Sequence, residues 1–231
     1  MVRLVKGAYW DAEIKRAQVD GLDGYPVYTR KVYTDPHRKI ALPRNLYGAD
    51  RFNSLGMDLA NEHVLQQLNT ALIVDAQEQR HVAPMLAATP ASAGDALKVL
   101  NPADHQDVVG TVQEASAADV ELALQQAVLA APQWAATAPA ERAACLERMA
   151  DLMEANMATL MGLAVRESGK TLPNAIAEVR EAVDFCRYYA AQVRSEFNNQ
   201  THPALGPVVC ISPWNFPLAT WCWPSLPSKP R

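Results

Sequence analysis

The clearest periodic pattern in the chain lies at residues 174–193, NAIAEVREAVDFCRYYAAQV. Its apolar residues are spaced alternately by three and four positions, which predicts a helix with one buried face. The expected buried stripe consists of Ile176, Val179, Val183, Cys186, Ala190 and Val193. The charged residues of the same helix are expected to form a solvated face, made of Glu178, Arg180, Glu181, Asp184 and Arg187.

Two further helical regions precede this one. Ser116 with Asp119 three residues later predicts a capped helix start, and Pro132 is expected to end that helix. The next helix is expected to open at Pro139 and, with a break or restart, to close at Gly169. The apolar faces expected are Val120, Leu124 and Val128 in the first region, and Leu146, Met149, Ala150, Met153, Leu160, Met161, Ala164 and Val165 in the second.

Strand patterns stand near the two ends of the chain. Val2–Val5 predicts a strand that a loop, GAYW, joins to a short helix around Ala12–Val19. Residues 207–212, PVVCIS, predict a strand buried on both faces. Residues 36–98 are polar and rich in proline, which favours a linker. The chain is therefore expected to belong to the α/β class.

Composition favours a soluble protein that acts on small molecules. The 231 residues are 49% hydrophobic and 20% charged, as in globular domains, and the net charge of −4 does not favour nucleic acid as a partner. Since no apolar run is long enough for a membrane span or a signal peptide, we expect a cytoplasmic protein. Five scattered histidines predict no metal site. Four cysteines without CxxC spacing are expected to be reduced and buried: Cys145, Cys186, Cys210 and Cys222.

The stretch RLVKGAYW, residues 3–10, combines two cations, a glycine and two aromatic side chains. Glycine permits close approach of a planar ligand, aromatic rings can stack on it, and cations attract anionic groups. The pattern by itself is weak, because Tyr9 and Trp10 could equally cover the edge of a core.

Residues 2–35, VRLVKGAYWDAEIKRAQVDGLDGYPVYTRKVYTD, resemble the proline dehydrogenase part of the bifunctional proline utilization A family. The resemblance implies a (β/α)₈ barrel that holds FAD, with this segment supplying a late strand at the flavin. It implies that Tyr9 packs against bound proline. The implied FAD contacts are Arg3, Lys6, Gly7, Ala8, Trp10 and Thr29, with Lys31 as a weaker candidate.

Residues 99–219 resemble the N-terminal part of an aldehyde dehydrogenase, in the version fused to proline dehydrogenase. The most specific motif is ISPWNFP, residues 211–217. The resemblance implies that the Asn215 side-chain amide donates to the oxyanion formed when a cysteine attacks the aldehyde. Alternatively, Asn215 only holds a turn. The implied NAD-binding residues are Ile211, Ser212, Pro213, Trp214 and Asn215.

The resemblance implies oxidation of L-proline to L-glutamate in two steps. FAD would take a hydride from proline and pass electrons to a quinone, with peripheral membrane contact in the intact enzyme, and NAD would then oxidise glutamate semialdehyde. Family members form homo-oligomers. The expected divisions are a barrel fragment at 1–35, a linker at 36–98, the aldehyde dehydrogenase portion at 99–219 and an aberrant tail at 220–231.

The chain departs from the family pattern at two places. After Asp35 it passes directly into linker-like sequence, and after Ala219 it reads TWCWPSLPSKPR, where the family has a helix. The family's catalytic cysteine, its glutamate base and most of the barrel are not recognised. We therefore expect an inactive remnant, produced by a deletion and a frameshift; the alternative is a non-catalytic helical module that binds intact aldehyde dehydrogenase subunits.

Overall fold

The computed structural model describes residues 41–87 and 94–218. The chain divides into two compact units, residues 1–46 and residues 47–231. In the first unit the described part contains a single 3₁₀ turn, η1 (Pro43–Asn45). The expected strand and helix near the N-terminus lie outside the described residues.

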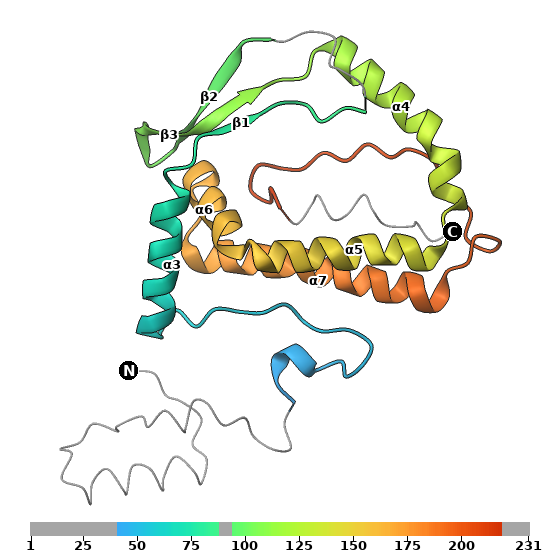
Figure 1. The fold of residues 1–231 in the computed structure, drawn as a ribbon, viewed down its shortest axis with the longest axis horizontal. Coiled ribbons are helices and arrows are strands. Elements are labelled where there is room, and N and C mark those ends of the chain that lie inside the picture. The colour runs from blue at the N-terminus through green and yellow to red at the C-terminus, as the bar shows by residue number, and fades with distance from the viewer. Residues whose placement is uncertain (1–40, 88–93, 219–231) are drawn as a thin grey trace, which may run out of the picture. The chain divides into compact units, whose positions relative to one another are not determined.

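The described part of the second unit combines a small sheet with five helices (Figure 1). In chain order its elements are α3 (Glu62–Asp75), β1 (Arg80–Val82), β2 (Ala96–Asn101), β3 (Asp104–Gln113), α4 (Ala117–Ala136), α5 (Pro139–Ala155), α6 (Met157–Ser168) and α7 (Leu172–Glu196). This content confirms the α/β class at the level of secondary structure.

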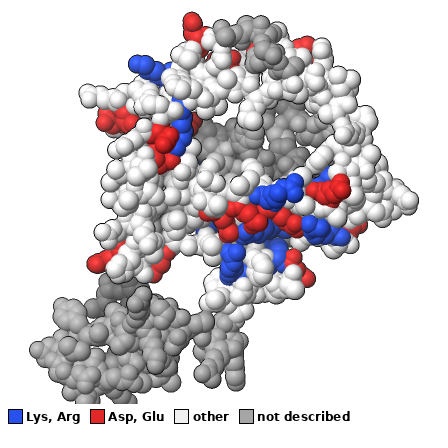
Figure 2. Space-filling model, viewed as in Figure 1, with Lys and Arg blue, Asp and Glu red and all other residues white. Residues whose placement is uncertain are grey.

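Helices α5, α6 and α7 form the hydrophobic core, with α5 and α7 lying side by side (Figure 1). All six residues of the predicted stripe on α7 are buried, so the periodicity predicted both the helix and its inner face. From α5 and α6, Ala143, Ala150 and Met161 complete the core without any exposure to solvent. Acidic and basic side chains lie intermixed along the outer face of this region (Figure 2).

The second predicted helical region is two helices, because the chain restarts at Asn156, whose backbone is not helical. Gly169 ends α6 as predicted, and its φ of 66° lies in the left-handed region that glycine adopts without strain. Met149 was expected on the buried face but is exposed, since it lies at the margin of the stripe formed by Leu146, Ala150 and Met153.

Helix α4 begins as predicted but ends later. Ser116 and Asp119 form a reciprocal capping box. The prediction that Pro132 ends the helix is wrong, because α4 continues to Ala136 with the proline inside it. Pro132 is exposed and lies in the last turns, where water can replace the backbone hydrogen bond that proline removes.

The sheet has the strand order β1-β3-β2, with β1 parallel and β2 antiparallel to the central strand. Gly110 of β3 is paired with Arg80, and a Cβ atom there would lie 2.7 Å from the Arg80 carbonyl oxygen. The 36–98 segment, expected to be an irregular linker, thus supplies α3, β1 and part of β2. Helix α3 was missed because its short apolar pattern depends on packing against α6, where Gly162 contacts Leu72.

The strand predicted at residues 207–212 is not formed. The segment has no regular secondary structure, and Val208, Val209 and Ile211 are exposed. A buried strand requires hydrogen-bonding neighbours, and the sheet of the described residues contains β1, β2 and β3 only. The expectation of buried cysteines is also wrong in part: Cys186 is buried, whereas Cys145 and Cys210 are exposed.

Candidate functional site

The ISPWNFP motif forms a compact turn at the surface. The Ser212 hydroxyl donates a hydrogen bond to the Phe216 carbonyl oxygen at 3.0 Å. The Phe216 N–H in turn donates to the Pro213 carbonyl oxygen at 3.0 Å. These two bonds close the turn around Trp214 and Asn215.

Two charged side chains attach this turn to the helical core. The Lys170 ammonium donates to the Asn215 carbonyl oxygen at 2.8 Å and forms an ion pair with Glu178 at 2.7 Å. The Leu218 N–H donates to the other Glu178 oxygen, Oε1, at 2.7 Å. Lys170 also lies over the Phe216 ring, 5.1 Å from its centroid. The chain is therefore held at Asn215 and again three residues later.

The local sequence explains where this pair lies. Gly169 turns the chain out of α6, and Thr171 caps α7 by accepting a hydrogen bond from the Asn174 N–H, so Lys170 falls at the junction of the two helices. The segment ESGKT, residues 167–171, therefore contains the end of α6, in agreement with the predicted close at Gly169. Glu178 follows on the second turn of α7 and faces the same junction.

Glu178 contradicts the prediction of a solvated face, because it is only 2% exposed. A signal was available in the sequence. Ala175 and Ala182 lie three residues before and four residues after Glu178, on the same side of the helix, and both are fully buried. Small residues that flank a charge at helical spacing predict close packing, and hence a partnered charge.

The predicted NAD-side residues all lie on this turn or just before it. Ile211 is 85% exposed and Trp214 is 78% exposed. Pro213 and Asn215 are also exposed, and Ser212 is half-buried. These side chains offer apolar surface and one amide to a ligand, but in the described residues they form an open wall rather than an enclosed pocket.

The predicted flavin and proline contacts cannot be placed, because they lie outside the described residues: Arg3, Lys6, Gly7, Ala8, Tyr9, Trp10 and Thr29.

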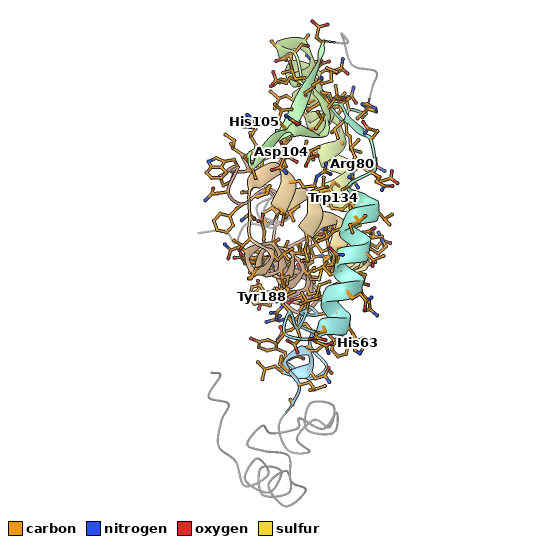
Figure 3. The ribbon with its side chains drawn as sticks, turned by 90° about the vertical axis from the view of Figure 1, so that its left-hand side faces the viewer. His63, Arg80, Asp104, His105, Trp134 and Tyr188 are labelled. Atoms are coloured by element: carbon orange, nitrogen blue, oxygen red, sulfur yellow. The ribbon has the colours of Figure 1, made fainter. Side chains whose placement is uncertain are left out.

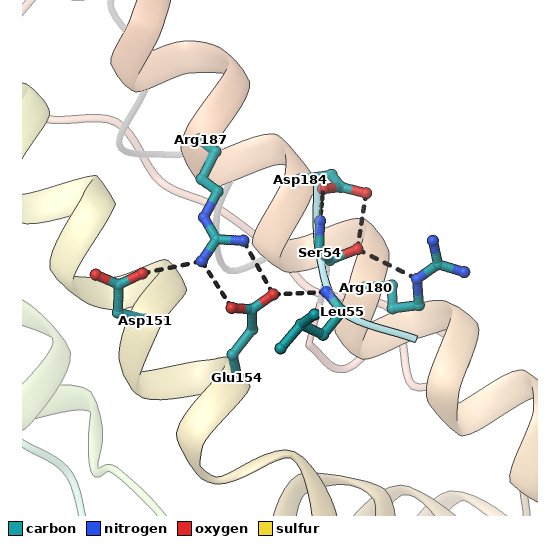
Figure 4. A network of polar contacts seen from close by, with 7 residues as sticks. All are labelled: Ser54, Leu55, Asp151, Glu154, Arg180, Asp184 and Arg187. Atoms are coloured by element: carbon teal, nitrogen blue, oxygen red, sulfur yellow. Dashed lines mark hydrogen bonds and ion pairs between the residues drawn. The ribbon is translucent and has the colours of Figure 1, made fainter. Parts of the chain in front are cut away.

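A second polar network, which the sequence did not predict, joins residues 54–55 to α5 and α7 (Figure 4). The Ser54 N–H and hydroxyl donate to the two Asp184 carboxylate oxygens at 2.6 and 2.9 Å, and Arg180 Nε donates to the Ser54 hydroxyl at 3.2 Å. The buried Ser54 shows that Asp184 and Arg180 bind a neighbouring segment instead of forming a solvated face.

The second half of this network is centred on Glu154. This carboxylate accepts two hydrogen bonds from Arg187, at 2.9 and 2.8 Å, and one from the Leu55 N–H at 2.6 Å. Glu154 and, to a smaller extent, Asp151 raise the pKa of Arg187 above its ordinary value. Arg187 is buried, which also contradicts the predicted solvated face. Of the charged residues predicted on the solvated face of α7, Arg187 contacts α5, whereas Arg180 and Asp184 contact Ser54.

Residues 41–87 and 94–218 contain no group of three histidine, cysteine, aspartate or glutamate side chains able to hold a metal ion. His63 of α3 and His105 of β3 lie far apart in the view of Figure 3. In the same part of the chain, no helix is both long and apolar enough to span a membrane.

Known sequence families match both parts of the chain. The profile of the aldehyde dehydrogenase family matches residues 89–228, and that of proline dehydrogenase matches residues 1–52. The bifunctional protein PutA of Klebsiella aerogenes is 39% identical over 356 aligned residues, which cover 95% of this chain. The chain spans 27% of the length of that relative.

Solved structures give the same result. Proline utilization A from Bdellovibrio bacteriovorus, inactivated by N-propargylglycine, is 27% identical with a TM-score of 0.63, covering 75% of this chain and 20% of its own. A 1-pyrroline-5-carboxylate dehydrogenase from Thermus with bound NAD is 26% identical with a TM-score of 0.62, covering 74% of this chain and 36% of its own. The chain therefore belongs to the aldehyde dehydrogenase family and resembles bifunctional proline utilization A over nearly all of its length.

Proposed function

We propose that the chain derives from a bifunctional enzyme that oxidises L-proline to L-glutamate. The observation that carries this proposal is the match of two different enzyme families to two consecutive parts of one chain, together with a PutA relative that aligns with 95% of it. We assign residues 1–35 to the barrel fragment, 36–98 to the connection, 99–219 to the aldehyde dehydrogenase portion and 220–231 to a divergent tail.

In the first part, FAD would accept a hydride from proline and pass the electrons to a quinone. We propose that Tyr9 contacts proline and that the flavin is held by Arg3, Lys6, Gly7, Ala8, Trp10 and Thr29. The residue types fit this role, because two cations can neutralise phosphate and a Gly-Ala step leaves room for a flat ring.

In the second part, NAD would accept a hydride during oxidation of glutamate semialdehyde. We propose that Ile211, Ser212, Pro213 and Trp214 line the nicotinamide side and that the Asn215 amide stabilises the oxyanion. The exposed indole and isoleucine surfaces suit contact with a flat aromatic ring. The anchored turn suits an amide that must be oriented before the reaction begins.

These 231 residues are proposed to be inactive by themselves. An oxyanion donor acts strongly only where water is excluded, whereas Asn215 and its neighbours are exposed. The carboxylate, flavin and barrel contacts of the first part would have to come from strands beside Val2–Val5.

An internal deletion is proposed to account for the missing barrel. The alignment with PutA extends over 356 residues, which exceeds the 231 residues of the whole chain, so the relative contains residues within the matched span that this chain lacks. Resequencing the locus tests this directly: an uninterrupted longer reading frame at that point would refute the deletion.

Cofactor titration tests the retained sites. We expect no saturable change in flavin absorbance with FAD and no saturable change in tryptophan fluorescence with NAD. If NAD does bind, Trp214→Ala should abolish the fluorescence change, whereas Trp134→Ala, at an exposed tryptophan on α4, should not. Proline-dependent reduction of an artificial acceptor by the purified chain would contradict inactivity.

A second candidate function is a non-catalytic helical module that associates with intact aldehyde dehydrogenase subunits in a homo-oligomeric assembly. The observation that favours it is the apolar surface of α4, where Val120, Leu124 and Val128 are all exposed. Mixing the chain with an intact enzyme and measuring the size of the complex separates the two functions. If the chain elutes together with the intact enzyme and the Val128→Asp variant does not, the helical module is supported. If the unsubstituted chain elutes separately from the intact enzyme, the inactive remnant is supported.

A further inference from the structure

The Lys170–Glu178 pair is nearly enclosed, although it lies beside an exposed turn. The Lys170 side chain is 15% exposed and the Glu178 side chain is 1% exposed. The ammonium has three contacts: the Asn215 carbonyl oxygen, the Glu178 carboxylate and the Phe216 ring. These contacts are one hydrogen bond, one ion pair and one cation–π contact, so three different groups hold the ammonium.

Glu178 contacts the chain three residues after Asn215. One carboxylate oxygen pairs with Lys170, and the other accepts the Leu218 N–H. The pair therefore fixes a carbonyl group at Asn215 and an amide group three residues later. With both groups held, the backbone between them has few ways to rotate, and the peptide group that follows the Asn215 Cα atom is held in place.

Stability alone is a poor reason for a buried pair. Removing two charges from water costs about as much as their attraction returns, and a matched apolar pair often serves a core as well or better. An apolar pair, however, offers neither a donor to the Asn215 carbonyl nor an acceptor to the Leu218 N–H. What only the charged pair supplies is orientation.

We propose that Lys170 and Glu178 are positioning residues for Asn215, holding the backbone of the turn in the conformation that would present the side-chain amide to the reacting oxygen in an intact enzyme. The inference rests on the proposed role of Asn215 in the oxyanion hole. It gives the ESGKT segment a function beyond ending α6, and it places that function on the rigid junction of two core helices.

Amide exchange at Phe216 tests the proposal without any ligand. The chain contains four phenylalanines, so ¹⁵N-phenylalanine labelling gives a simple spectrum, in which Phe216→Leu identifies the signal of interest. In the unsubstituted chain the Phe216 amide should exchange at least about tenfold more slowly than in a free peptide of residues 211–218. Exchange at the free-peptide rate overturns the proposal before any lysine or glutamate is changed.

Lys170→Met should speed Phe216 exchange about tenfold and leave the other three phenylalanine amides within about twofold. The matched control is Lys98→Met, at an exposed lysine on β2, which should change none of them. An unchanged Phe216 rate in Lys170→Met would contradict the proposal.

The double variant Lys170→Met/Glu178→Met separates positioning from packing. If the pair positions the turn, the double variant regains the urea midpoint of the unsubstituted chain while Phe216 exchange stays fast. If the pair is merely structural, the urea midpoint and the Phe216 exchange rate both return to those of the unsubstituted chain, which overturns the proposal. None of these readouts depends on NAD, so saturable NAD binding or proline-dependent turnover would count against the proposed inactivity of the chain and not against the positioning role.

Discussion

Helices α7 and α4 have similar sequence signals and opposite environments. Each begins with a side-chain cap and carries apolar residues at helical spacing. Yet α7 buries ten of its 25 residues, whereas α4, with 20 residues, buries Asp119 alone. Periodicity therefore predicts that a helix forms and which face is apolar, but not whether a partner covers that face.

The difference comes from neighbours. Helix α7 packs along α5 and against α6, and its polar side chains reach across to α5. Val120, Leu124 and Val128 of α4 are also at helical spacing, four residues apart, but remain exposed. Because a fully buried aliphatic side chain contributes roughly 1.5–3 kcal/mol relative to an exposed one, the two helices should respond very differently to the same substitution.

The largest expected effect is that of a charge in the core. Val183→Asp on α7 places an unpaired carboxylate at a position with no solvent exposure, and should lower the free energy of unfolding by about 3–5 kcal/mol or prevent folding. Val128→Asp makes the same change on α4, where it should cost less than about 0.5 kcal/mol. Urea unfolding followed by circular dichroism measures both.

An equal loss of stability in the two valine variants would mean that α4 is packed in solution. In that case the exposed stripe would be covered by another molecule, and the Val128→Asp chain should also differ in its oligomeric state.

The next effect concerns buried charge. Glu154→Ala removes the carboxylate that pairs with Arg187 and accepts the Leu55 N–H, so it leaves a buried guanidinium with a single exposed partner, Asp151. We expect a loss of about 2–4 kcal/mol. The matched variant on α4, Glu121→Ala, removes only an exposed contact with Gln125 and should be nearly neutral. Comparable urea midpoints for the two variants would contradict the network of Figure 4.

Helix caps should show the same contrast on a smaller scale. Thr171→Ala and Ser116→Ala each remove a side-chain acceptor at a helix start, worth about 1 kcal/mol. The loss at Thr171 should appear in global unfolding, because α7 belongs to the core. The loss at Ser116 should appear only as faster amide exchange within α4. A shift of the global midpoint in Ser116→Ala would show that the two helices unfold together.

The comparison also explains how far the sequence could be interpreted. The three long helical regions and the glycine end of α6 follow from local rules, since caps, proline at a first turn and apolar spacing act within a few residues. Helix α3 and the strands β1, β2 and β3 were not predicted, because their short patterns are stabilised by distant partners, such as Gly162 for α3 and Gly110 for β1. The buried strand at 207–212 was wrongly predicted for the same reason: an apolar run does not specify its neighbours.

The candidate site shows the same division. The resemblance at 211–217 indicated Asn215, but the residues that hold the turn were not recognised. Lys170 directly follows the predicted helix end at Gly169, and Glu178 was assigned to a solvated face. Only the fold brings these side chains, 45 and 40 residues away from their partners in the sequence, against the turn. Contacts at such separations leave no periodic signal.

The smallest expected effect is a pH dependence of the unfolding free energy, which arises where Arg166 of α6 contacts Asp107 of β3. Two hydrogen bonds from Arg166, and one from Asn101, lower the pKa of Asp107 from 3.8 to about 2. A carboxyl group whose pKa is lowered in the folded state stabilises it above pH 3.8, and this contribution disappears as the pH falls from 3.8 to about 2. Since both side chains are partly exposed, the contribution should be at most about 1 kcal/mol. Asp107→Asn cannot titrate, so the difference in unfolding free energy between the two chains should be constant from pH 7 to pH 5, should shrink below pH 3.8 and should be mostly lost by pH 2. A difference that persists unchanged at pH 2 would mean that Asp107 does not link β3 to α6 through its charge.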